Sequence, residues 1–136
     1  MRTLQIHVCF SFALWALYSP NSLSKSPMMA AMATAEGVSV FEEAIFSDRF
    51  RHVPALCRMG AKIHATRRYA VVTGMGKNLH GAQVEATDLR GGAAMVIAAL
   101  AAQGESRIAH TEHMERGYEA LPEVLRSCGA EIRKME

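Results

Sequence analysis

The sequence predicts a fold of the α/β or α+β class, in which one supersecondary unit is used twice. Strand-like runs alternate with helix-like runs along the 136-residue chain, which is the pattern of these classes. Residues 29–40, "MAAMATAEGVSV", also resemble residues 96–107, "VIAALAAQGESR", and residues 53–63, "VPALCRMGAKI", resemble residues 122–132, "PEVLRSCGAEI". Each copy reads helix, glycine, strand, polar loop with arginine, helix, Gly-Ala, strand. Such an echo is typical of a unit repeated around a shared core.

The first copy is bounded by glycine and proline. Its predicted elements are a helix at 28–35, a strand at 38–46, a helix at 50–59 and a hairpin of strands at 61–66 and 69–73. Gly37 and Gly60 follow the two helices, where glycine commonly ends a helix. Pro54 falls near the first turn of the second helix, a position that tolerates proline. The pair Arg67-Arg68 is predicted to form a solvated hairpin turn.

The second copy follows the same order with one more strand at its start. Its predicted elements are strands at 82–86, 106–110 and 130–134, and helices at 89–103 and 118–128. Gly104 and Gly129 follow the two helices. By this pattern, a strand and a loop should precede Met28 in the first copy. Half of a closed repeat domain exposes apolar faces, and we expect the helix at 28–35 to be the one left uncovered.

Residues 1–27, "MRTLQIHVCFSFALWALYSPNSLSKSP", do not match the rest of the chain. The apolar run at 4–18 is too short to span a membrane, so no membrane association is expected. An arginine before an apolar run resembles a signal peptide, but the best small-x-small cleavage site, at 22–24, is poor. We interpret residues 1–27 as a leader unrelated to the domain at 28–136, with secretion as the alternative.

Composition narrows the class of protein. The chain is 50% hydrophobic and 21% charged, which indicates a globular protein. A net charge of +2 without a basic stripe argues against nucleic-acid binding. Cys9, Cys57 and Cys128 are far apart and odd in number, which favours reduced thiols in a cytoplasmic protein. His110, Glu112 and His113 could suggest a metal site, but no further ligand cluster supports one, so no metal is expected.

The stretch "TDLRGG" at 87–92 opens the helix at 89–103 and carries candidate chemistry. Asp88 stands where it can cap the helix, and this role alone would explain why position 88 is an aspartate. Arg90 is a cation in the first turn, which is unfavourable by up to about 1 kcal/mol unless an anion lies nearby. Gly91 and Gly92 weaken the helix by about 1 kcal/mol each and leave room beside the backbone. A bound phosphate or carboxylate would account for all three residues.

An acidic residue with an arginine precedes a predicted helix three times. The pairs are Asp48-Arg49, Asp88 with Arg90, and Glu115-Arg116. Each could be a surface ion pair worth less than about 1 kcal/mol. On one side of a repeat architecture, the three loops could instead converge on one anionic ligand.

Three stretches together resemble a known family. They are "FEEAIFSDRFRHVPALCRMGAKI", "LHGAQVEATDLRGGAAMVIAALAAQGES" and "HMERGYEALPEVLRSCGAEI". They are similar, in order and in register, to the C-terminal part of the UDP-N-acetylglucosamine 1-carboxyvinyltransferases, which are enolpyruvyl transferases. The similarity runs from about Met28 to Glu136.

The resemblance implies a fold and a reaction. The fold is part of an inside-out α/β barrel built from βαβαββ-type units. The reaction moves the enolpyruvyl group of phosphoenolpyruvate onto the 3-hydroxyl of UDP-N-acetylglucosamine through a tetrahedral phospholactoyl intermediate, and it releases phosphate. This step opens peptidoglycan synthesis, so the resemblance implies a cytoplasmic transferase with two small-molecule substrates and no cofactor.

The resemblance also assigns residues. Arg90 in "TDLR" and Arg116 in "ERGYE" match arginines that face the phosphate and carboxylate of phosphoenolpyruvate, and Asp88 would orient the site. Guanidinium groups suit such oxyanions. Ile45 in "EAIFSDRF" matches a position that contacts the UDP-sugar, and Arg49 lies in the same motif.

The chain departs from the family pattern at several positions. Residues 91–94 are Gly-Gly-Ala-Ala where Ala-Ser-Ala-Ser is usual, and Glu115 replaces an aspartate. Leu23 stands where the "FPTD" motif would place its catalytic aspartate, and no N-terminal domain is present. We therefore expect a C-terminal fragment that is inactive alone and whose partner is a missing N-terminal domain. The alternatives are a stand-alone phosphate or UDP-sugar binding module, a secreted interaction domain, and a non-functional remnant.

Overall fold

The computed structural model of the chain describes residues 25–44 and 49–135. The elements in chain order are α2 (Lys25–Thr34), β1 (Val38–Glu42), α3 (Val53–Arg58), β2 (Lys62–Ala65), β3 (Tyr69–Thr73), β4 (Gln83–Glu85), α4 (Leu89–Ala101), β5 (Arg107–Ala109), α5 (Glu112–Gly117) and α6 (Leu121–Ser127). The signal-like run at 4–18, Leu23, Ile45 and Asp48 lie outside the described residues.

The strands form two small sheets. In the first, β3 is the central strand of the order β1-β3-β2 and pairs antiparallel with both neighbours. The hairpin predicted between β2 and β3 is confirmed, and its turn is closed by the Thr66 amide donating to the Tyr69 carbonyl at 2.7 Å. In the second sheet, β4 and β5 are parallel, as expected for strands joined through the helix α4.

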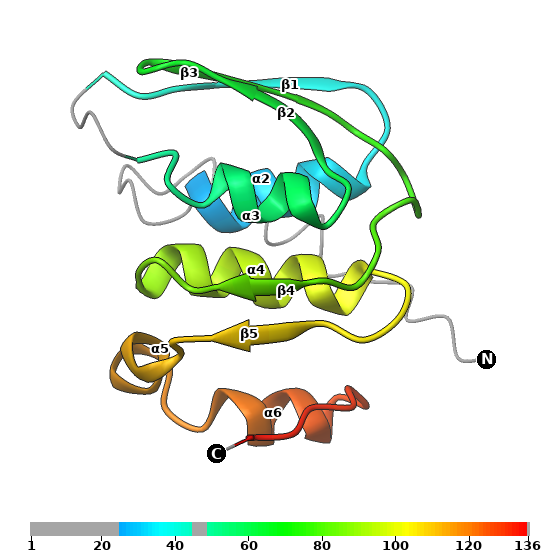
Figure 1. The fold of residues 1–136 in the computed structure, drawn as a ribbon, viewed down its shortest axis with the longest axis vertical. Helices are drawn as coiled ribbons and strands as arrows, with labels where there is room; N and C mark the ends of the chain where they lie inside the picture. The colour runs from blue at the N-terminus through cyan, green and yellow to red at the C-terminus, as the bar shows by residue number, and fades with distance from the viewer. Residues whose placement is uncertain (1–24, 45–48, 136) are drawn as a thin grey trace.

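The elements are stacked in layers (Figure 1). The three-stranded sheet is the outer layer at the top of the view, and α2 and α3 lie beneath it. Next come α4, β4 and β5, and α6 lies at the opposite end from the three-stranded sheet. This mixture of packed helices and strands confirms the predicted class.

The predicted repeat is visible in the backbone. Helix α2, Gly37 and β1 correspond to α4, Gly104 and β5, and the two glycines have φ values of 98° and 89°. The second helices of the copies, α3 and α6, are followed by glycines with φ values of 94° and 96°. All four glycines adopt the left-handed conformation that ends a helix and that other residues avoid.

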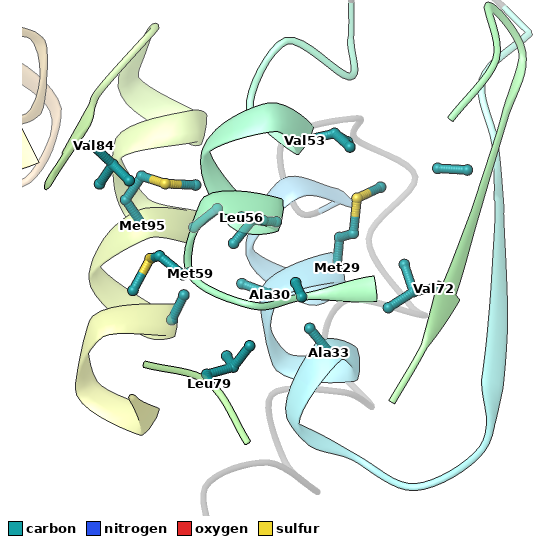
Figure 2. Close-up of a cluster of buried hydrophobic side chains, with 14 residues drawn as sticks. Met29, Ala30, Ala33, Val53, Leu56, Met59, Val72, Leu79, Val84 and Met95 are labelled. Atoms are coloured by element: carbon teal, nitrogen blue, oxygen red, sulfur yellow. The ribbon is translucent and has the colours of Figure 1, made fainter. Parts of the chain in front are cut away.

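The hydrophobic core lies between α2, α3, α4 and the inner face of the three-stranded sheet (Figure 2). Met29 of α2, Leu56 of α3, Val72 of β3 and Met95 of α4 have no exposed surface. The expectation that the Ala/Met helix is left uncovered is therefore wrong. Helix α2 packs along α4 in the next unit, and the sheet covers α2 on the other side, so Met29, Ala30 and Ala33 are enclosed.

A buried carboxylate anchors the start of α2. Glu43 is 3% exposed, and one of its carboxylate oxygens lies 3.1 Å from Nζ of Lys25. The same ammonium group donates to the backbone carbonyl of Glu42 at 2.6 Å. Because a buried carboxylate is costly unless it is paired, Lys25 ties the first turn of α2 to the chain that follows β1.

The second copy differs from the prediction at its end. The residues between β5 and α6 form a short helix, α5, where a loop was expected, and the following helix starts at Leu121 rather than at 118. Residues 130–134 are not a strand. In the first copy, the equivalent strand β2 pairs with β3, whereas no described strand lies where residues 130–134 could pair in this way.

Candidate active site

Asp88 caps helix α4, as its position in the sequence predicts. Its backbone is extended, with φ of −161°, and its carboxylate oxygen Oδ1 accepts a hydrogen bond of 2.6 Å from the Gly91 amide. This bond satisfies one of the amides that the first turn leaves without a partner. Negative charge here also suits the positive end of the helix dipole. Asp88 therefore fixes the conformation of the turn from which Arg90 projects.

The two glycines after Arg90 are explained by packing within the protein. A Cβ atom on Gly91 would lie 2.6 Å from Oγ1 of Thr87 and 2.9 Å from Oδ1 of Asp88. A Cβ atom on Gly92 would lie 2.6 Å from Sδ of Met114. The interpretation that Gly91 and Gly92 leave room for a ligand is therefore wrong, because protein atoms occupy that room. Their absent side chains let α5 and the Asp88 cap approach the helix closely.

His52 is a site residue that the sequence analysis missed. It precedes α3, is 3% exposed, and its Cβ lies 3.4 Å from the position of a Cβ on Gly91. Its Nε2 atom is buried and has no hydrogen-bond partner among the residues that the structure describes. Burial lowers its pKa from 6.5 to about 4, against the opposing effects of the Asp88 charge and a hydrogen bond with the Arg49 backbone. A neutral imidazole thus joins the start of α3 to the start of α4.

The sequence does not show that His52 is buried beside Asp88, because a single histidine before a helix belongs to no recognisable motif. Its position beside Asp88 depends on how α3 packs against α4, which is a tertiary contact. The only local signal is its place directly before the Val53-Pro54 helix start.

The side chains of Arg90 and Arg116 have no hydrogen-bond or ion-pair partner in the described part of the chain. Arg90 is half-buried in the first turn of α4, and Arg116 is exposed in the last turn of α5. Neither guanidinium makes a hydrogen bond or an ion pair with another described residue. Arg116 was predicted to precede a helix and instead ends one, where a cation is favourable.

The structure brings the two arginines to the same end of the molecule. A Cβ atom on Gly117, the residue after Arg116, would lie 2.5 Å from Cδ1 of Leu89, the residue before Arg90. The end of α5 and the start of α4 therefore touch, on the left of Figure 1. The residue directly before α3 lies at the same end, because the Cβ atom of His52 is 3.4 Å from the position of a Cβ atom on Gly91.

The acidic residues of these loops make different contacts. Asp88 caps α4, whereas a carboxylate oxygen of Glu115 lies 3.2 Å from Nζ of Lys134. Both groups of that second pair are more than half exposed, so their attraction is worth less than about 1 kcal/mol. Of the predicted substrate-binding residues, Arg49 is described and half-buried, and Ile45 lies outside the described residues.

The described residues do not provide what a metal site, a disulfide or a membrane span would require. These ranges contain no group of three His, Cys, Asp or Glu side chains placed to hold a metal ion, and His113 is exposed on α5. Cys57 and Cys128 are exposed free thiols. Among the described helices, none is long and apolar enough to cross a membrane.

The arrangement suits the binding of a small, multiply charged anion. Arg90 and Arg116, whose guanidinium groups have no partner among the described residues, lie near the start of α4, which is the positive end of its dipole. Paired forks of this kind bind carboxylate and phosphate oxygens well.

Comparison with known proteins identifies relatives of this chain. Residues 22–125 match the family model described as EPSP synthase (3-phosphoshikimate 1-carboxyvinyltransferase). A UDP-N-acetylglucosamine 1-carboxyvinyltransferase of Cereibacter sphaeroides is 50% identical over 111 residues, which is 82% of this chain and 26% of the relative. A protein named UDP-N-acetylglucosamine 1-carboxyvinyltransferase 3, from Symbiobacterium thermophilum, is 50% identical over 110 residues. The chain thus spans about a quarter of the length of the curated relatives it matches.

A solved structure supports the same relationship. The enolpyruvyl transferase NikO from Streptomyces tendae superposes with a TM-score of 0.76 at 34% sequence identity, covering 83% of this chain and 26% of NikO. The predicted fold, part of an inside-out α/β barrel, is confirmed by this similarity.

Proposed function

Because the chain belongs to the EPSP synthase family, we propose that it forms part of a UDP-N-acetylglucosamine 1-carboxyvinyltransferase. The observation that carries this proposal is the 50% identity to enzymes of that name over 82% of the chain. In the proposed reaction, the 3-hydroxyl of UDP-N-acetylglucosamine loses its proton and adds to C2 of phosphoenolpyruvate, while C3 gains a proton. C3 then loses a proton as the bond from C2 to the phosphate oxygen breaks, which restores the vinyl group and releases phosphate.

In this proposal, Arg90 and Arg116 bind phosphoenolpyruvate. Its phosphate and carboxylate carry the charges that two unengaged guanidinium groups can neutralise, and the phosphate gains charge as it leaves. The support is that both arginines lie at one end of the molecule without partners among the described residues. The cost of placing a cation in the first turn of α4 would be offset by the bound anion.

The remaining predicted residues have supporting roles in the proposal. Asp88 holds the first turn of α4 and thereby orients Arg90. Arg49 and Ile45 belong to the loop before α3 and are proposed to contact the UDP-sugar. Their assignment rests on the family resemblance and, for Arg49, on its place three residues before His52, which lies beside Gly91 at the start of α4.

We further propose that this activity needs the rest of the family's length. The chain spans 26% of its relatives, and general acid–base catalysis needs groups on both sides of the substrate. Residues 28–136 are proposed as the C-terminal portion of the enzyme domain, with residues 1–27 as a leader. The proposed reaction begins peptidoglycan synthesis, so the chain is placed in the cytoplasm.

A chimera tests the proposal. The 111 residues of the Cereibacter sphaeroides relative that align with this chain are replaced by the corresponding residues of this chain. Phosphate release from phosphoenolpyruvate is then measured with UDP-N-acetylglucosamine. We expect an active chimera in which Arg90→Ala lowers kcat/KM by about 100-fold or more, because removing one preorganised charge at an oxyanion costs roughly 3 kcal/mol.

The matched control is Arg107→Ala. Arg107, at the start of β5 and away from the start of α4, is exposed to solvent and pairs with Glu105 at 2.9 Å. Its replacement should leave kcat/KM within about two-fold, since surface ion pairs contribute little. Unchanged kinetics in the Arg90→Ala chimera would refute the assigned role, and an inactive parent chimera would refute the function. Binding of UDP-N-acetylglucosamine by the 136-residue chain alone, with an inactive chimera, would favour the binding module instead.

A further inference from the structure

His52 is a buried polar side chain that the proposed reaction does not use. It is 3% exposed, and its Nε2 atom is buried without a hydrogen-bond partner among the described residues. Buried polar atoms in folded proteins nearly always have partners, so this one needs an explanation. A leucine would fill the space between α3 and α4 without burying a polar ring, and packing alone therefore does not explain the histidine.

The contact with Arg49 shows how the ring is held. A hydrogen bond with the Arg49 backbone raises the pKa of His52, although burial lowers it further, to about 4. A hydrogen bond raises the pKa of an imidazole when a ring N–H donates it, and the backbone acceptor is a carbonyl. Because Nε2 has no partner, the donor is Nδ1. His52 is thus a neutral imidazole that carries its proton on Nδ1 and holds the Arg49 carbonyl.

On its other side, the ring lies against a part of the chain that is fixed by its own contacts. The Cβ atom of His52 is 3.4 Å from the position of a Cβ atom on Gly91, and the charge of Asp88 acts on the ring. The Asp88 carboxylate accepts from the Gly91 amide at 2.6 Å, and Met114 packs closely against Gly92. The first turn of α4 therefore keeps its shape without His52, and the ring takes its position from that turn.

We propose that His52 is a positioning residue for Arg49. Seated against the first turn of α4, its Nδ1–H holds the Arg49 carbonyl and so sets the turn at residues 49–52 relative to the turn that carries Arg90. The inference rests on the proposed function for what Arg49 contacts, which is the UDP-sugar. Loss of the imidazole should therefore weaken binding of UDP-N-acetylglucosamine. It should leave the phosphoenolpyruvate side nearly unchanged, because the Asp88 cap holds Arg90.

Three replacements separate the two ring nitrogens. The side-chain amide of asparagine reaches the position of Nδ1 and can donate to the same carbonyl, whereas the amide of glutamine reaches the position of Nε2. Leucine fills the space and supplies neither group. If His52 acted only by packing, replacing it would lower the amount of folded protein and would not change the affinity for one substrate in particular.

The first experiment measures the ring nitrogens of His52 by 15N NMR in the 136-residue chain at pH 7. We expect two well-separated resonances, from a protonated Nδ1 and a bare Nε2. The exposed His64 on β2 serves as the internal control and should show the two tautomers averaged. Averaged tautomers at His52 would overturn the proposal, because the ring would then not be held by the Arg49 carbonyl.

The second experiment measures binding of UDP-N-acetylglucosamine to the chimera by calorimetry, which needs no turnover. His52→Leu should raise Kd about ten-fold, because the Arg49 carbonyl loses its donor. His52→Asn should restore Kd to within about two-fold of the parent, and His52→Gln should not. His64→Leu is the matched control and should leave Kd unchanged. In an active chimera, KM for phosphoenolpyruvate should stay within about three-fold in every variant that circular dichroism shows to be folded.

The outcomes separate this inference from the proposed function. An active chimera in which His52→Leu leaves Kd unchanged would overturn the inference alone. An inactive chimera whose binding of UDP-N-acetylglucosamine depends on His52 in the expected way would overturn the function alone, and a chimera that neither binds nor reacts would overturn both. Repair by glutamine instead of asparagine would also overturn the inference, since Nε2 would then be the working atom. If the leucine variant does not fold, the comparison of asparagine with glutamine decides.

Discussion

At the scale of single residues, His52 is the most informative side chain. Its pKa is lowered from 6.5 to about 4 by burial, so the folded chain keeps the imidazole neutral where the unfolded chain protonates it. Above pH 6.5 the His52 imidazole is neutral in both the folded and the unfolded chain, so it does not make stability depend on pH. As the pH falls from 6.5 to 4, the unfolded state binds the extra proton and stability declines, by roughly 3 kcal/mol in all.

We therefore predict that His52→Gln makes the chain less sensitive to acid. The free energy of unfolding, measured in urea at pH 7 and at pH 4.5, should fall less in the variant than in the parent chain. His64→Gln is the control, since His64 is exposed on β2. An identical pH dependence in the parent and the His52 variant would mean that His52 is protonated in the folded chain.

Some features of the site could be predicted from local sequence, and others depend on contacts made only in the folded chain. Asp88 could be predicted as a cap because the pattern of a carboxylate before a helix is local. The reason why residues 91 and 92 are glycines could not be predicted. The side chains of Met114 and Asp88 leave no room for a Cβ atom there, and they come close only in the folded chain. Arg90 and Arg116 could be grouped only through the repeat and the family resemblance, because the local sequence around one arginine does not point to the other.

At the scale of elements, the turn after the first helix of each copy is held by a close backbone contact with a glycine. A Cβ atom on Gly74, which follows β3, would overlap the backbone carbonyl oxygen of Ala35 at the end of α2. The Gly74 amide also donates to the Gly37 carbonyl at 2.8 Å. In the second copy, a Cβ atom on Gly81 would overlap the carbonyl oxygen of Glu105. The turns that follow α2 and α4 thus each lie against a glycine from elsewhere in the chain.

We predict that Gly74→Ala lowers the free energy of unfolding by about 3 kcal/mol or more, because backbone cannot move aside as a side chain can. The control is Gly76→Ala, where a new Cβ atom meets nothing within 4 Å and only the positive φ of 59° opposes it. That change should cost about 1–2 kcal/mol. Urea denaturation of both variants gives the comparison, and equal losses would argue against the close contact at Gly74.

The elements themselves could mostly be predicted from the sequence, since helix-ending glycines and apolar runs are local signals. The exceptions have physical causes. Helix α3 begins at Val53 rather than at 50, with Pro54 in its first turn, where its missing N–H costs nothing. Residues 130–134 have a strand-like composition, but a strand needs a neighbour, and composition does not supply one.

At the scale of the whole molecule, one core serves both copies. The cluster includes Met29 and Leu56 from the first copy with Met95 and Ala98 from the second. Neither copy can lose its packing without exposing apolar surface of the other, so the two should unfold together. This shared core is also why the Ala/Met helix is covered, which the sequence of one copy could not reveal.

We predict that Leu56→Ala destabilises the whole described fold by about 2–5 kcal/mol, since Leu56 is fully buried. Amide hydrogen exchange should accelerate together in β3 and in α4, which belong to different copies. Cys57→Ala, at the adjacent exposed position, should change stability by less than about 0.5 kcal/mol. Faster exchange confined to α3 and the three-stranded sheet would show two independent cores.

The packing of α2 against α4 also has a consequence for synthesis on the ribosome. Met29 emerges well before Met95, and translation adds about 5–20 residues per second, so α2 waits for roughly three to thirteen seconds before α4 exists. During that interval Met29, Ala30 and Ala33 lack α4, the helix against which they are buried in the folded chain. These apolar side chains therefore stay only partly covered until α4 has left the exit tunnel.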